Sequence, residues 1–217
     1  MQGALLTAAR RVVGDGARVI GASRTDAGVH ALRQVASLAA ETALDAPTVL
    51  RALNALLPGD VRVVAATEAA PTFDARRAAC GKRYAYVIDA GAVASPLLRR
   101  FAWHIPMPLD LEAMRAALDA VRGLHDFSAF CAAAGREAMP VCRVRAIHLV
   151  RQRAWLALLV SGDRFLHHMV RNLVGSAVAV GRGAHEPGWL GDVLASRDRR
   201  RAGATAPAHG LTLVRVY

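Results

Sequence analysis

The spacing of apolar residues predicts alternating helices and strands over residues 1–70. Helical spacing predicts a helix over Leu5–Val13 and a second helix that Asp45 caps, with Pro47 in its first turn and its end before Pro58. Shorter apolar stretches predict three strands, over Ala17–Ala22, Gln34–Ala40 and Val61–Ala66. This part of the chain therefore has the predicted order helix, strand, strand, helix, strand.

Residues 71–217 have the predicted order strand, helix, strand, strand, helix, strand. The first strand is predicted by the alternation within Lys82–Ile88, where Tyr84 faces one side and Arg83 the other. The elements that follow are a helix capped by Asp110, a loop over 123–140, strands over Val144–Val150 and Trp155–Val160, a helix from Phe165 to Val180, a short helix over Trp189–Ala195 and a strand over Leu211–Tyr217. This order is typical of a ferredoxin-like, or split β-α-β, fold.

The first half matches the same unit without its opening strand. In this topology the opening strand lies inside the sheet, so its loss leaves two unpaired edges. We therefore predict an α+β fold of two ferredoxin-like halves, residues 1–70 and 71–217, with antiparallel sheets flanking a basic cleft. We also expect that the chain as given lacks an N-terminal strand; the alternative is that a partner subunit or the 123–140 loop covers the gap.

The charge of the chain points to a polyanionic partner. There are 28 Lys and Arg residues against 17 Asp and Glu, a formal net charge of +11, which indicates nucleic acid first. Lys82 is the only lysine and alanine is abundant, so a GC-rich coding bias is the alternative explanation. The 54% of hydrophobic residues excludes a disordered chain.

The cysteines and the apolar runs indicate a cytoplasmic protein. Cys80, Cys131 and Cys142 form no CxxC pair and leave one cysteine over, which argues against a disulfide framework or a zinc site. The longest apolar runs fall well short of the roughly 20 residues that cross a bilayer, and the chain does not open on a basic and apolar leader.

One acidic residue stands at the tip of a predicted turn. Residues 21–30 read GASRTDAGVH, so that Asp26 follows Arg24 by two positions and precedes Ala-Gly. A strand, turn and strand in this order can present the Asp26 carboxylate to a ligand. Ordinary turn chemistry explains an Asp at this position as well.

Two further residues are candidates for the same site. Arg171 falls on the flank of the apolar stripe of its predicted helix, and a half-buried Arg usually has a carboxylate or an anionic ligand as partner; a solvated charge at the helix edge is the alternative. Tyr84 follows Lys82 and Arg83, which suits stacking on a base, although a tyrosine in the core is commoner.

His167 and His168 suggest a metal, but neighbouring helical residues point about 100° apart and no HExxH or i,i+4 His pair is present, so we predict no metal.

Five stretches together resemble the tRNA pseudouridine synthase A family, which modifies uridines 38–40 of the tRNA anticodon arm. They read GASRTDAGVHALRQV, FDARRAACGKRYAYVI, HDFSAF, DRFLHHMVRNLVGSAVAVGRG and APAHGLTLVRVY, and the resemblance covers essentially the whole chain. Family members normally begin with a strand carrying Asp-Gly and Gly-Trp-Gln, which this chain does not match. Ser23 and Arg33 also stand where the family usually has Gly.

The resemblance implies a role for each candidate residue. Asp26 would be the nucleophile that attacks C1′ or C6 of the uridine, both routes remaining open. Because aspartate is already ionised at neutral pH, Arg171 would aim and hold the carboxylate. Tyr84 would stack on the flipped base, and Arg24 would fill the space that the base leaves, with a phosphate contact as its alternative role.

The resemblance further implies an isomerase without cofactor or metal, a homodimer, and the anticodon stem-loop of tRNA as partner, with no membrane. Two other functions stay open. The first is a catalytically impaired RNA-binding protein or tRNA chaperone of the same fold. The second is a hydrolase with an Asp nucleophile, for which the sequence shows no paired carboxylate to activate water.

Overall fold

The computed structural model describes residues 1–132 and 139–217, which form two compact units. The N-terminal unit comprises Met1–Arg24 and Gln34–Ala79, and the C-terminal unit comprises Thr25–Arg33 and Cys80–Tyr217. The short segment Thr25–Arg33 thus belongs to the C-terminal unit, although both of its neighbours in sequence belong to the other one. Among the described residues, no helix is both long and apolar enough to cross a membrane.

The N-terminal unit packs two helices on a small sheet. Strands β1 (Arg18–Gly21) and β3 (Ala36–Ala39) pair antiparallel, and helices α1 (Gln2–Val13) and α2 (Ala46–Leu56) bury Ala8, Ala9, Val49 and Leu53 against Val19. The predicted cap of the second helix is present, because the Asp45 side chain accepts a hydrogen bond from the Thr48 amide at 2.9 Å. A short helix, α3 (Ala75–Ala78), follows near the end of the unit.

The strand predicted over Val61–Ala66 is wrong: the structure describes these residues and assigns no strand to them. Val61 and Val63 do pack against the N-terminal core, which accounts for the apolar pattern. The backbone of Val63, however, bonds to a side chain, since Asn54 accepts from the Val63 amide at 2.8 Å and donates to the Val63 carbonyl at 2.7 Å. A side-chain amide therefore takes the part that a neighbouring strand would have taken.

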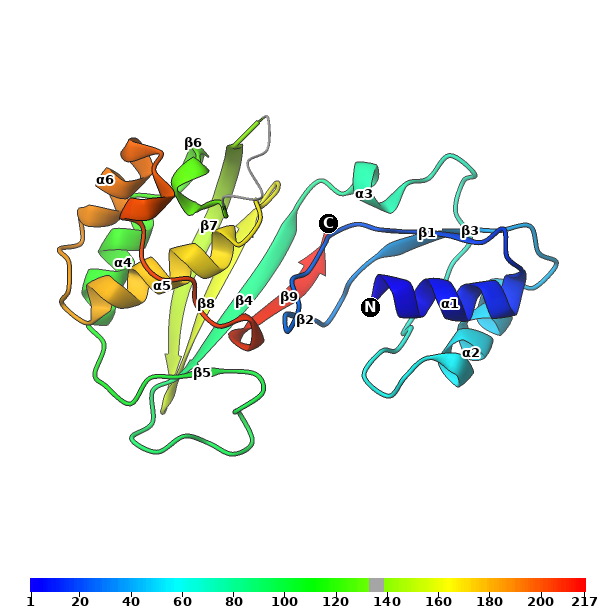
Figure 1. Cartoon of the computed structure of the whole chain (residues 1–217), viewed down its shortest axis with the longest axis horizontal. Coiled ribbons are helices and arrows are strands. Elements are labelled where there is room, and N and C mark those ends of the chain that lie inside the picture. Colours follow the sequence, from blue (N-terminus) through cyan, green and yellow to red (C-terminus); the bar gives the residue numbers. More distant parts are fainter. Residues whose placement is uncertain (133–138) are drawn as a thin grey trace. The chain divides into compact units, whose positions relative to one another are not determined.

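The C-terminal unit contains a seven-stranded sheet, with helices over one face (Figure 1). The strands lie in the order β2 (His30–Ala31), β9 (Leu211–Val216), β4 (Lys82–Asp89), β8 (Trp155–Gly162), β7 (Val141–Gln152) and β6 (Gly123–Asp126), with β5 (Trp103–His104) on the end of β4. Pairing is antiparallel except for β2 on β9 and β5 on β4, which are parallel. The helices are α4 (Leu111–Asp119), α5 (Met169–Gly181) and α6 (Trp189–Ser196), and the short 3₁₀ turns are η1 (Ser128–Phe130), η3 (Arg199–Arg201) and η4 (Ala208–Gly210).

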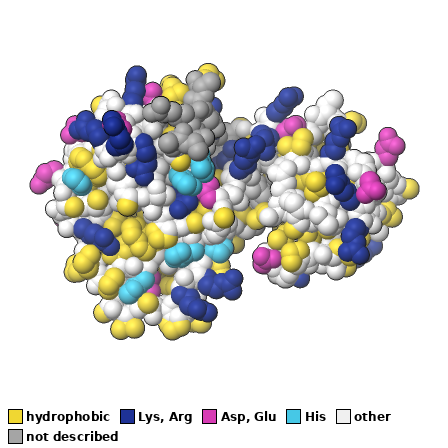
Figure 2. All heavy atoms as spheres, in the orientation of Figure 1, with side chains coloured by type: hydrophobic (Ala, Val, Ile, Leu, Met, Phe, Trp, Pro, Cys, Tyr) yellow, Lys and Arg dark blue, Asp and Glu magenta, His cyan; other side chains and the backbone are white. Residues whose placement is uncertain are grey.

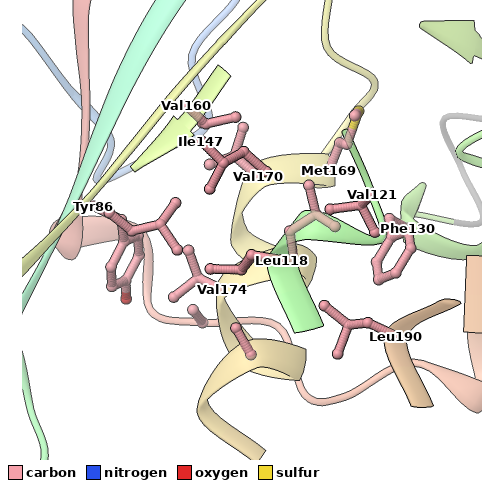
Figure 3. Close-up of a cluster of buried hydrophobic side chains, with 14 of the residues drawn as sticks. Tyr86, Leu118, Val121, Phe130, Ile147, Val160, Met169, Val170, Val174 and Leu190 are labelled. Carbon is pink, nitrogen blue, oxygen red and sulfur yellow. The ribbon is translucent and has the colours of Figure 1, made fainter. Parts of the chain in front are cut away.

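The core of this unit lies between the sheet and the helices (Figure 3). Along β4, Tyr84, Tyr86 and Ile88 are buried while the residues between them are partly exposed, as the alternation predicts. Val174 of α5 and Leu118 of α4 close the core from the helical side. The mixed α+β class is therefore confirmed.

Two expectations about the C-terminal unit are wrong in detail. The 123–140 loop contains β6 and η1, and its residues 133–138 lie outside the described part of the chain. The helix expected from Phe165 begins at Met169 instead. Its N-cap, His168, has a left-handed backbone with φ of 61°, so that residues before it cannot continue the helix.

Candidate active site

Asp26 lies in a tight turn that is attached to the last strand of the chain. The Asp26 carbonyl accepts a hydrogen bond from the Val29 amide at 3.1 Å, and Gly28 has φ of 82°, which the third position of such a turn requires. Directly after the turn, β2 pairs in parallel with β9, and the Leu32 amide donates to the Leu213 carbonyl at 2.8 Å. The C-terminal strand therefore fixes the position of the Asp26 turn.

Arg171, in the first turn of α5, holds the Asp26 carboxylate. Its Nη1 donates to Asp26 Oδ2 at 3.0 Å, and its Nε donates to the Ala206 carbonyl at 2.8 Å. The side chains are only partly exposed, 14% for Arg171 and 23% for Asp26, so water screens their attraction less than at an open surface. The planar guanidinium is thereby fixed at two points, and it orients one carboxylate oxygen.

The segment that receives Arg171 Nε is itself held on the core. The Ala206 amide donates back to the Arg171 carbonyl at 3.2 Å, and the Tyr86 hydroxyl donates to the Pro207 carbonyl at 2.9 Å. Burial raises the pKa of the Tyr86 hydroxyl far above its usual range, against the opposing effect of the Arg171 charge, so Tyr86 remains a neutral donor. On the next residue of α5, Asn172 Oδ1 accepts from the Thr205 hydroxyl at 2.7 Å.

Two histidines complete the surroundings of the carboxylate. His167 Nε2 lies 3.5 Å from Asp26 Oδ1, and His168 Nε2 lies 3.3 Å from Asp26 Oδ2. The two rings face one another with centroids 3.9 Å apart. Their common orientation was missed from sequence because both residues were assigned to a helix, whereas they precede it.

The cluster formed by Asp26, His167 and His168 could in principle hold a metal ion. Each residue offers a ligand atom, and these atoms lie within 4.8 Å of one another; the argument from a helical separation of the histidines therefore does not apply. The Arg171 guanidinium, however, already stands 3.0 Å from Oδ2, where a cation would meet its positive charge. We assign no metal to this cluster.

The other two predicted site residues have different surroundings. Tyr84 of β4 belongs to the C-terminal unit and is 6% exposed, with its ring edge-on to Phe165 at a centroid distance of 5.3 Å. Arg24 is the last residue of the first segment of the N-terminal unit and is exposed. Asp26 and Arg171 are thus brought together, Tyr84 lies in the core of the same unit, and Arg24 belongs to the other unit.

Basic side chains are spread over the face that Figure 2 shows, and do not form a single patch there. One basic pocket in the C-terminal unit is lined by Lys82, Arg83, Arg145, Ser161, Gly162 and Tyr217. Arg83 and Arg215 both lie over the Tyr217 ring, at 5.8 and 5.1 Å from its centroid. Cations with an exposed aromatic ring suit contact with a nucleic-acid backbone and its bases.

Comparison with known proteins identifies what this chain is similar to. A family model described as tRNA pseudouridine synthase matches residues 117–217. Over its whole length the chain is 43% identical to tRNA pseudouridine synthase A of Myxococcus xanthus and 44% identical to that of Chloroflexus aurantiacus, and it covers 82% and 79% of those proteins. It is also 38% identical over its whole length to tRNA pseudouridine synthase A of a Thermoanaerobacter species, of which it covers 88%.

Proposed function

Since the chain belongs to the tRNA pseudouridine synthase A family and isomerises uridine to pseudouridine in tRNA, we propose that Asp26 is the covalent nucleophile of this reaction. The observation that carries the proposal is the hydrogen bond of Arg171 to Asp26 Oδ2. It leaves Oδ1 free of that guanidinium, on a side chain that is 23% exposed and so within reach of a ligand.

A single carboxylate is sufficient to catalyse this reaction as a nucleophile. The N1–C1′ bond of uridine breaks and a C5–C1′ bond forms, so the product has the same atoms and the same oxidation state as the substrate. A carboxylate can attack C1′, where the transition state resembles an oxocarbenium ion, or C6 of the ring; both routes stay open. Neither route requires a redox cofactor.

Arg171 acts in this proposal as the residue that orients the nucleophile. Its second anchor, the Ala206 carbonyl, prevents the guanidinium from following the carboxylate when the latter moves toward the substrate. Such preorganisation contributes to catalysis because reacting atoms must meet within a few tenths of an ångström of the productive geometry.

In this proposal Tyr84 and Arg24 stabilise the state in which the target base has left the helical stack. Extrusion of a base costs on the order of a few kcal/mol, and stacking on an aromatic ring returns roughly 1–3 kcal/mol. We propose Tyr84 as this ring, although little of it is exposed, and Arg24 as the side chain that enters the space left by the base. A phosphate contact remains the alternative role of Arg24.

The finer points of substrate and assembly are part of the same proposal. We propose uridines 38–40 of the anticodon stem-loop as targets, a homodimer as the assembly, and the cytoplasm as the compartment. The division into ferredoxin-like halves, 1–70 and 71–217, around a basic cleft also remains a prediction. In support of the second half, β4, α4, β7, β8, α5 and β9 occur in this order in the chain, with β5, β6 and α6 inserted between them, and their strands lie in the order β9, β4, β8, β7.

A direct test maps pseudouridine in unmodified tRNA after incubation with the protein. We expect product at positions 38–40 with the wild type, none with Asp26→Ala, and wild-type product with Asp119→Ala, a control at a carboxylate that is 65% exposed. Undiminished product from Asp26→Ala would refute the nucleophile. Tight tRNA binding without product in the wild type would instead favour the impaired RNA-binding protein.

A further inference from the structure

Pseudouridine formation requires a proton transfer for which no residue has yet been named. When C5 bonds to C1′, C5 still carries its hydrogen. The C5–H bond must then break, and its electron pair becomes the C5–C6 double bond. At the same time the C6–N1 pair returns to N1, or the aspartate leaves C6, depending on the route. N1 ends with a proton, so the net change is one proton moved from C5 to N1.

We propose that His168 is the catalytic base that accepts the C5 proton and passes a proton to N1. This inference rests on the proposed role of Asp26. It adds a residue that neither the family resemblance nor the comparisons single out.

The position of His168 makes it able to reach C5 by either route. Attack of Asp26 at C6 puts C5 one bond from the attacked atom, and attack at C1′ requires C5 to take the place of N1 there. In both cases C5 comes within a few ångströms of the Asp26 carboxylate. His168 Nε2 lies 3.3 Å from Oδ2 of that carboxylate, so an atom that comes next to the carboxylate also comes close to the imidazole.

Backbone strain supports a functional position for His168. Its φ of 61° lies in the left-handed region, which is strained for a non-glycine residue and which often occurs at active sites. The strain stays because Met169 begins α5 directly afterwards, with its amide bonded to the Leu166 carbonyl at 3.1 Å. As the N-cap in this conformation, His168 turns its ring toward Asp26 and makes no side-chain cap hydrogen bond.

Burial of the His168 imidazole favours its neutral, basic form. Burial lowers the pKa of His168, and the positive charges of His167, Arg171 and Arg199 add to this effect. The Asp26 carboxylate opposes them. Among the kinds of side chain that contact Asp26, an imidazole can accept a proton and pass it on, whereas a guanidinium cannot act as a base.

His168 is a better candidate than His167 on burial and backbone conformation. The His167 side chain is 45% exposed and that of His168 is 28% exposed, so His168 is the better shielded from water. The His167 backbone is also outside the left-handed region. His167 is therefore tested as the competing base, and the exposed His148 of β7 is the control.

The test separates proton removal from the earlier steps. We would compare the wild type, His168→Asn, His168→Gly, the competitor His167→Ala and the control His148→Asn in single turnovers on tRNA transcripts that carry uridine, 5-deuterouridine or 5-fluorouridine. Asn and Gly both tolerate a left-handed backbone, so the loop keeps its conformation. With 5-fluorouridine there is no C5 proton to remove, and the reaction stops after the C5–C1′ bond forms.

We expect His168→Asn to slow uridine conversion by about 10²–10⁴-fold and to show a larger C5 deuterium isotope effect than the wild type. C–C bond formation with 5-fluorouridine should stay near the wild-type rate, and added imidazole should partly restore His168→Gly. Equal slowing with uridine and 5-fluorouridine, an unchanged isotope effect, or the same defect in His167→Ala would overturn the proposal. Asp26→Ala is assayed in parallel: reaction of this variant with 5-fluorouridine would refute the nucleophile and leave the role of His168 to be judged on its own data.

Discussion

Arg171 and Asp26, 145 positions apart in the chain, form a hydrogen-bonded ion pair of 3.0 Å. The pair depends on two attachments. The Asp26 turn is attached to β9 through β2, and Arg171 is attached to the Ala206 carbonyl. Because β9 follows the Ala206 segment in the chain, the C-terminal 202–217 region supports both partners.

The shape of the guanidinium should matter more than its charge. Arg171→Lys keeps a positive charge but cannot bond the Ala206 carbonyl and Asp26 Oδ2 together. We expect tRNA affinity close to that of the wild type and a loss of most turnover, by about 10²-fold. Filter binding and single-turnover kinetics measure the two effects. Near-normal single-turnover rates would contradict an orienting role.

Arg24 should affect turnover more than binding. If its side chain fills the space of the flipped base, Arg24→Ala should slow single turnovers by on the order of 10-fold or more, since extrusion costs a few kcal/mol and the variant lacks a side chain that offsets part of this cost. Arg10→Ala, at an exposed residue of the same unit, is the control. A loss confined to affinity, with a weaker salt dependence of binding, would favour the phosphate contact.

The ring of Tyr84 should matter through its aromatic face. Tyr84→Phe keeps the ring and its edge contact with Phe165, whereas Tyr84→Leu keeps an apolar side chain without a π-face. We expect Tyr84→Leu to be about 5- to 150-fold slower than Tyr84→Phe, which corresponds to the roughly 1–3 kcal/mol of a stacked base. Thermal unfolding of both variants separates this effect from loss of the core. Equal rates for Phe and Leu would rule out stacking.

Gly175 lies in α5, the helix that carries Arg171, and should not tolerate a larger side chain. A Cβ added at Gly175 would overlap the Ala204 carbonyl oxygen, so Gly175→Ala should lower the free energy of unfolding by about 2–4 kcal/mol. Gly191→Ala is the matched helical control, because its Cβ would make an ordinary 3.6 Å contact with Ala120. Denaturant unfolding compares them, and equal stability of the two variants would contradict this packing.

The pH dependence of the single-turnover rate on the acidic side should reflect the protonation of His168. Its pKa is lowered from 6.5, first by burial, so the imidazole remains neutral until the pH falls below that value. We expect the single-turnover rate of the wild type to fall only below pH 6.5, and this limb to disappear in His168→Asn.

The free energy of unfolding should change with pH in the same direction as the rate. The unfolded chain binds this proton more readily than the folded chain below pH 6.5, so the free energy of unfolding should decrease as the pH falls through that range. Denaturant unfolding between pH 5 and 7 tests this, with His168→Asn as reference. A free energy of unfolding that increases in the wild type, relative to His168→Asn, as the pH falls would contradict this prediction.

Local sequence determined much of the C-terminal unit and pointed to two candidate site residues. Alternation within β4 placed Tyr84 and Tyr86 on the buried face, because side-chain direction in a strand depends only on the residue's parity. The family was predicted from the same stretches and is confirmed. Asp26 and Arg171 were chosen as candidates from their neighbours in sequence.

Tertiary structure alone decided how these residues meet. Only the pairing of β2 with β9 shows that the Asp26 turn belongs to the C-terminal unit, since a two-residue strand carries no readable pattern. Likewise, the left-handed backbone of His168 makes α5 begin at Met169, four residues later than the apolar spacing predicts, and so lets both imidazoles turn toward one carboxylate. Periodicity is a local property, whereas long-range hydrogen bonds and backbone strain arise from packing between distant segments.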